Sequence, residues 1–282
     1  FQINNTYYGG EYTVKDGTEN IRERGEIVTY DGKEQLKDSW WTDEGARQLK
    51  GVHDFTLAFH PFMKREDAVS MFSSYLCRTV SFLFTEDTEV QGIPTYRFRI
   101  PASAFDPKEH PGFCHATDKV FYRAQNESEK HCYPRGIMQV AKCRKSEPSA
   151  VLSMPNFHTA PEEVQRSIEG LNATESERDA GSVDVEPTLG TPLRAHRALQ
   201  FNVEFWAGKD IMLPAYHTKQ RSALIPLVIV HEDSEMTEEI AHKVRKALFL
   251  TQIVIPGLCF VVLLTALVVL VATVIFALKK VR

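Results

Sequence analysis

Two dipeptides in which cysteine and histidine are neighbours, Cys114-His115 and His131-Cys132, are the residues in this chain best suited to bind a metal or to react. Two thiolates and two imidazoles can hold zinc in a tetrahedral site, although the spacing lacks the usual Cys-x-x-Cys turn. The alternative is disulfide formation, because an even set of four cysteines precedes residue 150 and can form two bridges in an oxidising compartment: Cys77, Cys114, Cys132 and Cys143. We favour disulfides over zinc and expect no metal site.

Catalytic motifs are missing from the sequence. It has no Gly-x-Ser-x-Gly elbow, His-Glu-x-x-His pair, P-loop or Gly-x-Gly-x-x-Gly turn. The run His231-Glu232-Asp233 lies between an apolar stretch and an expected helix, which predicts a solvated loop with a capping acid. Asp179, Asp184 and Glu186 could suggest calcium, but the EF-hand pattern is missing and they are interpreted as surface acids. We therefore expect neither an enzyme nor a cofactor.

The elements that must position these residues are expected to be mostly strands. Residues 26–30 run into Asp31-Gly32, which predicts a strand and a tight turn. Alternating apolar residues over 79–84, 96–100 and 199–205 predict further antiparallel strands. The continuous apolar run 223–230 predicts a strand buried on both faces, with Pro226 at an edge or bulge. Helices are expected over 159–170, 234–248 and 64–73. The fold class is mainly β with short helices (α+β).

A C-terminal membrane helix is the strongest single prediction. Residues 253–278 carry no charge, and 26 residues at about 1.5 Å each exceed a hydrocarbon core of about 30 Å. Three basic residues lie on each side of the run, so the positive-inside rule does not orient it. Three glycosylation sequons precede it, at Asn4, Asn126 and Asn172, and with the cysteines they place that side outside the cytosol. We expect an ectodomain over 1–247, a span over 248–278 and a cytosolic tail over 279–282.

The charge distribution argues against nucleic-acid binding. The net charge is −4, but residues 241–282 hold six basic and no acidic side chains. Residues 1–240 therefore carry 27 basic and 37 acidic side chains, and neutralising phosphates needs the opposite balance.

An ordered series of short segments resembles the class B scavenger receptors, the family of the fatty-acid translocase, croquemort-like receptors and sensory neuron membrane proteins. The series includes Cys77-Arg78, residues 92–98 (GIPTYRF), 154–157 (MPNF), 184–187 (DVEP) and 197–202 (RALQFN). The resemblance runs from about residue 10 through the span. It implies a large antiparallel β-barrel-like ectodomain with an apolar tunnel, and it implies that a first span and about half of the ectodomain precede this sequence.

The resemblance also implies site residues and partners. Cys77 with Cys143 follows the family pattern, and Cys114 with Cys132 would be a rewired pair. The candidate tunnel lining is Phe98, Phe157, Phe201 and Phe205, although alternating aromatic residues of this kind more often form ordinary core. The implied function is a membrane receptor that binds lipids, fatty acids or lipoprotein particles and passes lipid towards the membrane. The alternative is an endosomal or lysosomal trafficking receptor for a protein cargo, and protein ligands would dock on the preceding half. The expected location is the plasma membrane, with the endosomal or lysosomal membrane as the other possibility.

Overall fold

The computed structural model describes residues 10–53, 59–117, 129–144, 150–205 and 223–281. The chain divides into two units, one formed by residues 1–90 with 94–235 and the other by 91–93 with 236–282. The predicted sequons at Asn4 and Asn126 lie outside the described residues.

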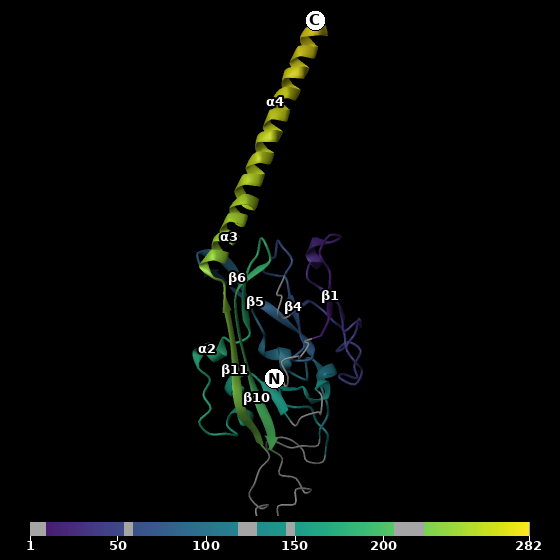
Figure 1. Ribbon diagram of the computed structural model, residues 1–282, viewed down its shortest axis with the longest axis vertical. Coiled ribbons are helices and arrows are strands. Elements are labelled where there is room, and N and C mark those ends of the chain that lie inside the picture. Colours follow the sequence, from purple (N-terminus) through teal and green to yellow (C-terminus); the bar gives the residue numbers. More distant parts are fainter. Residues whose placement is uncertain (1–9, 54–58, 118–128, 145–149, 206–222, 282) are drawn as a thin grey trace, which may run out of the picture. The chain divides into compact units, whose positions relative to one another are not determined.

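The first unit is built on β-sheet, as the fold class predicted (Figure 1). A two-stranded sheet pairs β1 (Tyr12–Val14) with β2 (Ile27–Tyr30). A sheet of nine described strands has the order β3-β4-β5-β6-β9-β10-β8-β7, with β11 also paired to β10. Its strands are β3 (Val52–His53), β4 (Val69–Ser73), β5 (Arg78–Val90), β6 (Ile93–Arg99), β7 (Ile137–Gln139), β8 (Ala150–Ser153), β9 (Ser182–Glu186), β10 (Thr191–Phe205) and β11 (Ala223–Glu235). Over the described residues this sheet is open and does not close into a barrel.

The long strand β10 joins three neighbours. Its first half pairs with β9, from Thr191 opposite Glu186 to His196 opposite Ser182. Its second half, from Gln200 to Val203, pairs with β8. Strand β11 runs along the other edge for the length of Arg194 to Phe205. All three pairings are antiparallel, which confirms the strand predicted over 199–205 and its direction.

Two tight turns fix the register of the early strands. Asp31 and Gly32 both have positive φ (50° and 72°), and so do Gln91 and Gly92 (52° and 73°) between β5 and β6. Two consecutive left-handed residues make the type I′ turn whose twist suits a two-residue hairpin, and glycine is the residue that adopts this region without strain.

Strand β11 departs from its predicted burial. The bulge is real, because Phe201 pairs with Val228 and Asn202 with Pro226, leaving Leu227 as the extra residue. The prediction of burial on both faces is wrong: Leu227 is 65% exposed and Val228 and Val230 are each 42% exposed. Among the described strands β11 pairs with β10 alone, and an apolar run does not by itself reveal how many layers cover it.

Helical structure in the first unit is short. The helix predicted over 159–170 is the single turn α1 (Glu162–Gln165), and residues 64–73 contain β4 rather than a helix. The other α-helix, α2 (Glu175–Arg178), begins with a capping box in which the Thr174 side chain and the Glu177 carboxylate each satisfy the other's backbone N–H. The described part of the unit also contains five 3₁₀ turns, at Ile21–Glu23, Ala102–Phe105, Pro111–Phe113, Ala141–Cys143 and Pro155–Phe157.

The second unit is dominated by a continuous helix. It consists of α3 (Glu238–Phe249), a π-turn at Leu250–Val254 and α4 (Ile255–Val281). The predicted start at 234 is early, because Ser234 and Glu235 still belong to β11. The π-turn lies directly before Pro256, whose missing N–H removes one helical hydrogen bond. The helix Glu238–Lys279 has a mean hydropathy of 3.1 in its most apolar stretch and is long enough to cross a membrane.

Candidate functional site

An apolar cavity of about 350 Å³ lies within the first unit. Strands β4 and β5 line it on one side, through Met71, Val80 and Phe82, and β10 and β11 line it on the other, through Leu199 and Val230. These strand pairs are separated by β6 and β9 in the sheet order, so the sheet must curl to bring them to one cavity. The volume falls within the range of about 300–1,000 Å³ typical of small-molecule sites.

The four phenylalanines predicted to line a tunnel are separated by the fold. Phe201 lines the cavity. Phe98 is fully buried in the main core and packs edge-on against Phe84, 6.2 Å between ring centroids. Phe157 is fully buried in a second, smaller core, and Phe205 is 39% exposed at the end of β10. Phe98, Phe157 and Phe205 therefore do not line this cavity.

Sequence reasoning missed most of the lining. Phe82 and Val80 share one face of β5, and Leu199 shares a face of β10 with Phe201, so period-two alternation could have found them. No local signal marks Met71 as a residue facing β10, because that contact depends on the curl of the sheet.

The face of β10 opposite Leu199 and Phe201 carries polar side chains that are completely buried. Gln200, Asn202 and Ser153 are all 0% exposed. The Gln200 side-chain N–H donates to the Asn202 side-chain oxygen at 2.7 Å, and the Asn202 amide donates to Ser153 Oγ at 3.0 Å. Gln200 Oε1 accepts from the backbone N–H of Asn156, a residue with φ 50°, at 2.8 Å. The groups satisfy one another, so burial costs little and the turn before Phe157 is fixed in place.

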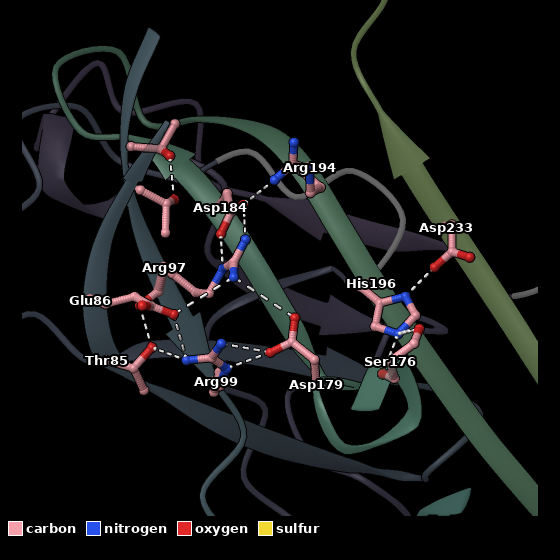
Figure 2. Close-up of polar contacts among 12 residues, drawn as sticks. Thr85, Glu86, Arg97, Arg99, Ser176, Asp179, Asp184, Arg194, His196 and Asp233 are labelled. Atoms are coloured by element: carbon pink, nitrogen blue, oxygen red, sulfur yellow. Dashed lines mark hydrogen bonds and ion pairs between the residues drawn. The ribbon is translucent and has the colours of Figure 1, made fainter. Parts of the chain in front are cut away.

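A network of ion pairs crosses β6, β9 and β10 (Figure 2). Arg97 binds Asp184 with two hydrogen bonds of 2.6 and 2.7 Å, and Arg194 Nη1 lies 3.4 Å from the same carboxylate. Asp184 is 1% exposed, which overturns its interpretation as a surface acid. The hydrogen bond to Asp184 raises the pKa of Arg97, so the Arg97 guanidinium stays charged at physiological pH. Beside it, Arg99 bridges Asp179 (2.6 Å) and Glu86 (2.9 Å).

Glu186 is also buried, at 3% exposure. Its two carboxylate oxygens accept the backbone N–H groups of Thr188 and Leu189, at 2.8 and 2.7 Å. Glu186 therefore closes the turn between β9 and β10 and is not a surface acid. Over the described residues no group of three or more His, Cys, Asp or Glu side chains is placed to hold a metal, so Glu186 belongs to no calcium-binding cluster there.

The run 231–233 forms part of β11 rather than a loop. His196 pairs across the ribbon with Asp233, and Arg197 pairs with Glu232 at 2.9 Å. Arg197 and Glu232 line the cavity, whereas the His196 ring donates through Nδ1 to the Asp233 carboxylate and through Nε2 to the backbone oxygen of Ser176 (Figure 2). Burial lowers the pKa of His196, but the hydrogen bonds to Asp233 and Ser176 outweigh it, and the net pKa lies above 6.5.

The four cysteines of the first unit form two bridges. Cys77 pairs with Cys143, with Cα atoms 6.3 Å apart, and Cys114 pairs with Cys132, with Cα atoms 5.4 Å apart. Cys77–Cys143 is the pair of the family pattern, and Cys114–Cys132 is the rewired pair named in the sequence analysis. The zinc alternative does not fit this pairing, because a disulfide sulfur is not a thiolate ligand. Cys259, in α4, is free.

The third sequon lies in an exposed turn before α2. Asn172 is exposed, and Thr174 caps α2 through its hydroxyl. An exposed asparagine in an irregular segment is the geometry that a glycosylation acceptor needs.

The chemistry available at the cavity is that of binding. Its lining is mainly apolar, its charged members Arg197 and Glu232 neutralise each other, and burial of apolar surface contributes about 25 cal/mol per Å². A curled, mainly antiparallel sheet with an apolar cavity, two disulfides and a long apolar C-terminal helix defines a β-rich, membrane-anchored protein.

Comparison with known proteins gives the family. The profile of the CD36 family matches residues 1–277, and the chain belongs to this family of membrane receptors. Among curated relatives, the chain is 26% identical over 252 residues to lysosome membrane protein 2 of Mus musculus, covering 87% of this chain and 47% of that protein. It is 28% identical over 269 residues to sensory neuron membrane protein 1 of Bombyx mori, covering 95% and 47%. The chain spans about half the length of the curated relatives it matches.

Proposed function

We propose that this protein is a lipid-binding receptor whose apolar cavity holds an acyl chain and passes it towards the membrane. The observation that carries the proposal is the cavity of about 350 Å³ lined by strands from both sides of the curled sheet. Its exposed lining residues, Val230 and Glu232 among them, belong to β11, so a ligand has access along the β10–β11 edge. Family membership in a group of receptors agrees with this role.

The proposal places the β-rich unit outside the cytosol. The disulfides and the exposed Asn172 sequon support an extracellular or luminal side. The names of its relatives point to two membranes, the lysosomal membrane and the membrane of sensory neurons. We propose the plasma membrane, with endosomal or lysosomal membranes as the second location.

A crosslinking experiment tests the cavity. The full chain in detergent micelles is incubated with a palmitic acid that carries a mid-chain diazirine, irradiated, and digested for mass spectrometry. We expect adducts on peptides from β5 and β10.

The matched variants are Val80→Phe and Leu227→Phe. Val80 is 4% exposed and lines the cavity beside Phe82, whereas Leu227 is 65% exposed on β11 and does not line it. An apolar cavity of about 150 Å³ holds a benzene ring, so the larger ring at 80 would fill a substantial part of the space. Adducts should fall several-fold in Val80→Phe and persist in Leu227→Phe. Adducts confined to α4, or undiminished in a Val80→Phe variant that melts normally, would refute lipid binding in this cavity.

A further inference from the structure

A second, much smaller pocket surrounds Arg78. Its volume is about 30 Å³, which is room for about two water molecules or for one chloride or formate ion. Trp41, His110, Tyr133 and the Cys114–Cys132 bridge line it, with Arg78 and Gln139. None of these residues entered the argument for lipid binding.

Arg78 is a buried cation without an acidic partner. It is only 7% exposed, and no carboxylate of a described residue lies within 4.0 Å of its guanidinium. Its Nη2 donates to the backbone oxygen of Ala104 at 2.9 Å, and its Nε is buried with no hydrogen-bond partner. The guanidinium carbon lies 3.5 Å from the ring centroid of Phe113, a cation–π contact that offsets part of the desolvation. Buried charges are normally paired, so this one lacks a counter-ion.

The other polar groups of the pocket permit an anion. Gln139 Oε1 is buried with no hydrogen-bond partner, and a terminal amide can turn to present its N–H₂ donors instead. Trp41 Nε1 is occupied by the Cys77 backbone oxygen at 2.6 Å. Asp106 is the one acid in the lining, and its Oδ1 accepts the backbone N–H of Lys108 at 2.9 Å.

The electrostatics of the pocket agree with an uncompensated positive charge. Desolvation lowers the pKa of Arg78 to about 9, so the side chain is still protonated at pH 7. Desolvation lowers the pKa of His110 as well, and the charge of Arg78 lowers it further.

We propose that the Arg78 pocket binds one compact monovalent anion, held by the guanidinium and by the Gln139 amide. The anion is a free halide or small carboxylate, or the carboxylate of an acyl chain. The second source follows from position, because Leu76 and Phe105 line both this pocket and the apolar cavity and form the wall between them. Only this second source rests on the proposed lipid function.

Thermal unfolding of the full chain in dodecyl maltoside micelles, followed by tryptophan fluorescence, tests the site. Sodium methanesulfonate is exchanged for sodium chloride or sodium formate at constant ionic strength. A ligand that binds only the folded state raises Tm, and we expect a saturable rise of about 2–4 °C with chloride and formate. Methanesulfonate is too large for the pocket and serves as the reference.

Arg78→Met and Arg144→Met form a matched pair of variants. Arg144 also donates to a backbone oxygen and also lies over an aromatic ring, that of Tyr75, but it does not line the pocket. The anion-dependent rise should vanish in Arg78→Met and remain in Arg144→Met. Arg78→Lys keeps one charge and should retain the rise with a higher apparent Kd, which decides the matter if Arg78→Met does not fold. The proposal is overturned if wild type shows no saturable rise, or if the Arg78 variants respond as wild type does.

Decanoate and decanol distinguish the two sources of the anion. If an acyl carboxylate occupies the pocket, saturating decanoate abolishes the chloride dependence and decanol leaves it intact. If the site takes a free ion, the chloride dependence persists with both. A protein that binds neither decanoate nor decanol but keeps its chloride dependence would refute the lipid function and leave the anion site standing.

Discussion

Replacement of Arg97 by methionine should destabilise the β-rich unit far more than loss of an ordinary surface ion pair. Arg97 is the bidentate partner of Asp184, whose side chain is 2% exposed. Removing one member of a buried pair costs about 3–5 kcal/mol, because the other charge is left without compensation. Arg194 still lies 3.4 Å from the Asp184 carboxylate and can compensate in part. We therefore expect a loss near the lower end, about 3 kcal/mol.

The control is Arg166→Met. Arg166 pairs with Glu162 on the surface, with side chains 77% and 69% exposed, and pairs of this kind contribute under about 1 kcal/mol. Urea unfolding of the full chain in micelles, followed by tryptophan fluorescence, measures both variants. A loss of 3 kcal/mol corresponds to a fall in Tm of about 6–12 °C for a unit of this size. A loss below about 1 kcal/mol for Arg97→Met, or an equal loss for Arg166→Met, would show that the buried pair does not contribute as its geometry indicates.

Four further predictions address other parts of the first unit. The pKa of His196 is raised in the folded state, so its protonated pair with Asp233 stabilises the fold fully below about pH 6.5, and this contribution is lost as pH rises through the folded pKa. Asp233→Asn should lower the pKa of His196 measured by NMR titration, and an unchanged pKa would contradict the pairing. Gly190→Ala should cost about 1–3 kcal/mol in urea unfolding, because φ is +66° and a Cβ would lie 2.3 Å from a backbone oxygen; a neutral effect would show that the turn relaxes. Cys132→Ser opens a bridge with a sequence separation of 18 and should cost about 3 kcal/mol by the chain-entropy estimate, and equal stability of the reduced and oxidised wild type would argue against it. Asn172→Gln should remove one glycosidase-sensitive shift in gel mobility from protein made in secretory cells, and wild-type mobility in that variant would count against a luminal position for this sequon.

Local patterns in the sequence were sufficient for some of the elements, although not for residues 64–73, which contain β4 in place of a helix. The alternation over 199–205, the Asp31-Gly32 turn and the uncharged run 253–278 each predict a structure that the fold confirms. Each depends on the backbone conformation and hydration of neighbouring residues, which the residue types themselves determine. The ordered segments from Cys77-Arg78 onwards were likewise sufficient for the family.

Burial was decided by tertiary structure. Gln200 and Asn202 are polar, yet they are fully buried because Ser153 comes from β8 to complete their hydrogen bonds. Asp184 was interpreted as a surface acid because the guanidinium that neutralises it is 87 residues away in the sequence. In both cases the partner that offsets the cost of desolvation is distant in the chain, so no short stretch of sequence shows that the side chain will be buried.

The cavity and the Arg78 pocket were also decided by tertiary structure. Of the four phenylalanines that the resemblance offered as lining residues, only Phe201 lines the described cavity. The curl that brings β4 and β5 opposite β10 and β11 depends on the pairing of six strands, and the isolation of Arg78 depends on which carboxylates the fold leaves out of reach. The residue types alone determined the long strands and the apolar C-terminal helix, because these depend on neighbouring residues, and the long-range pairing of the sheet decided which side chains lie between the strands.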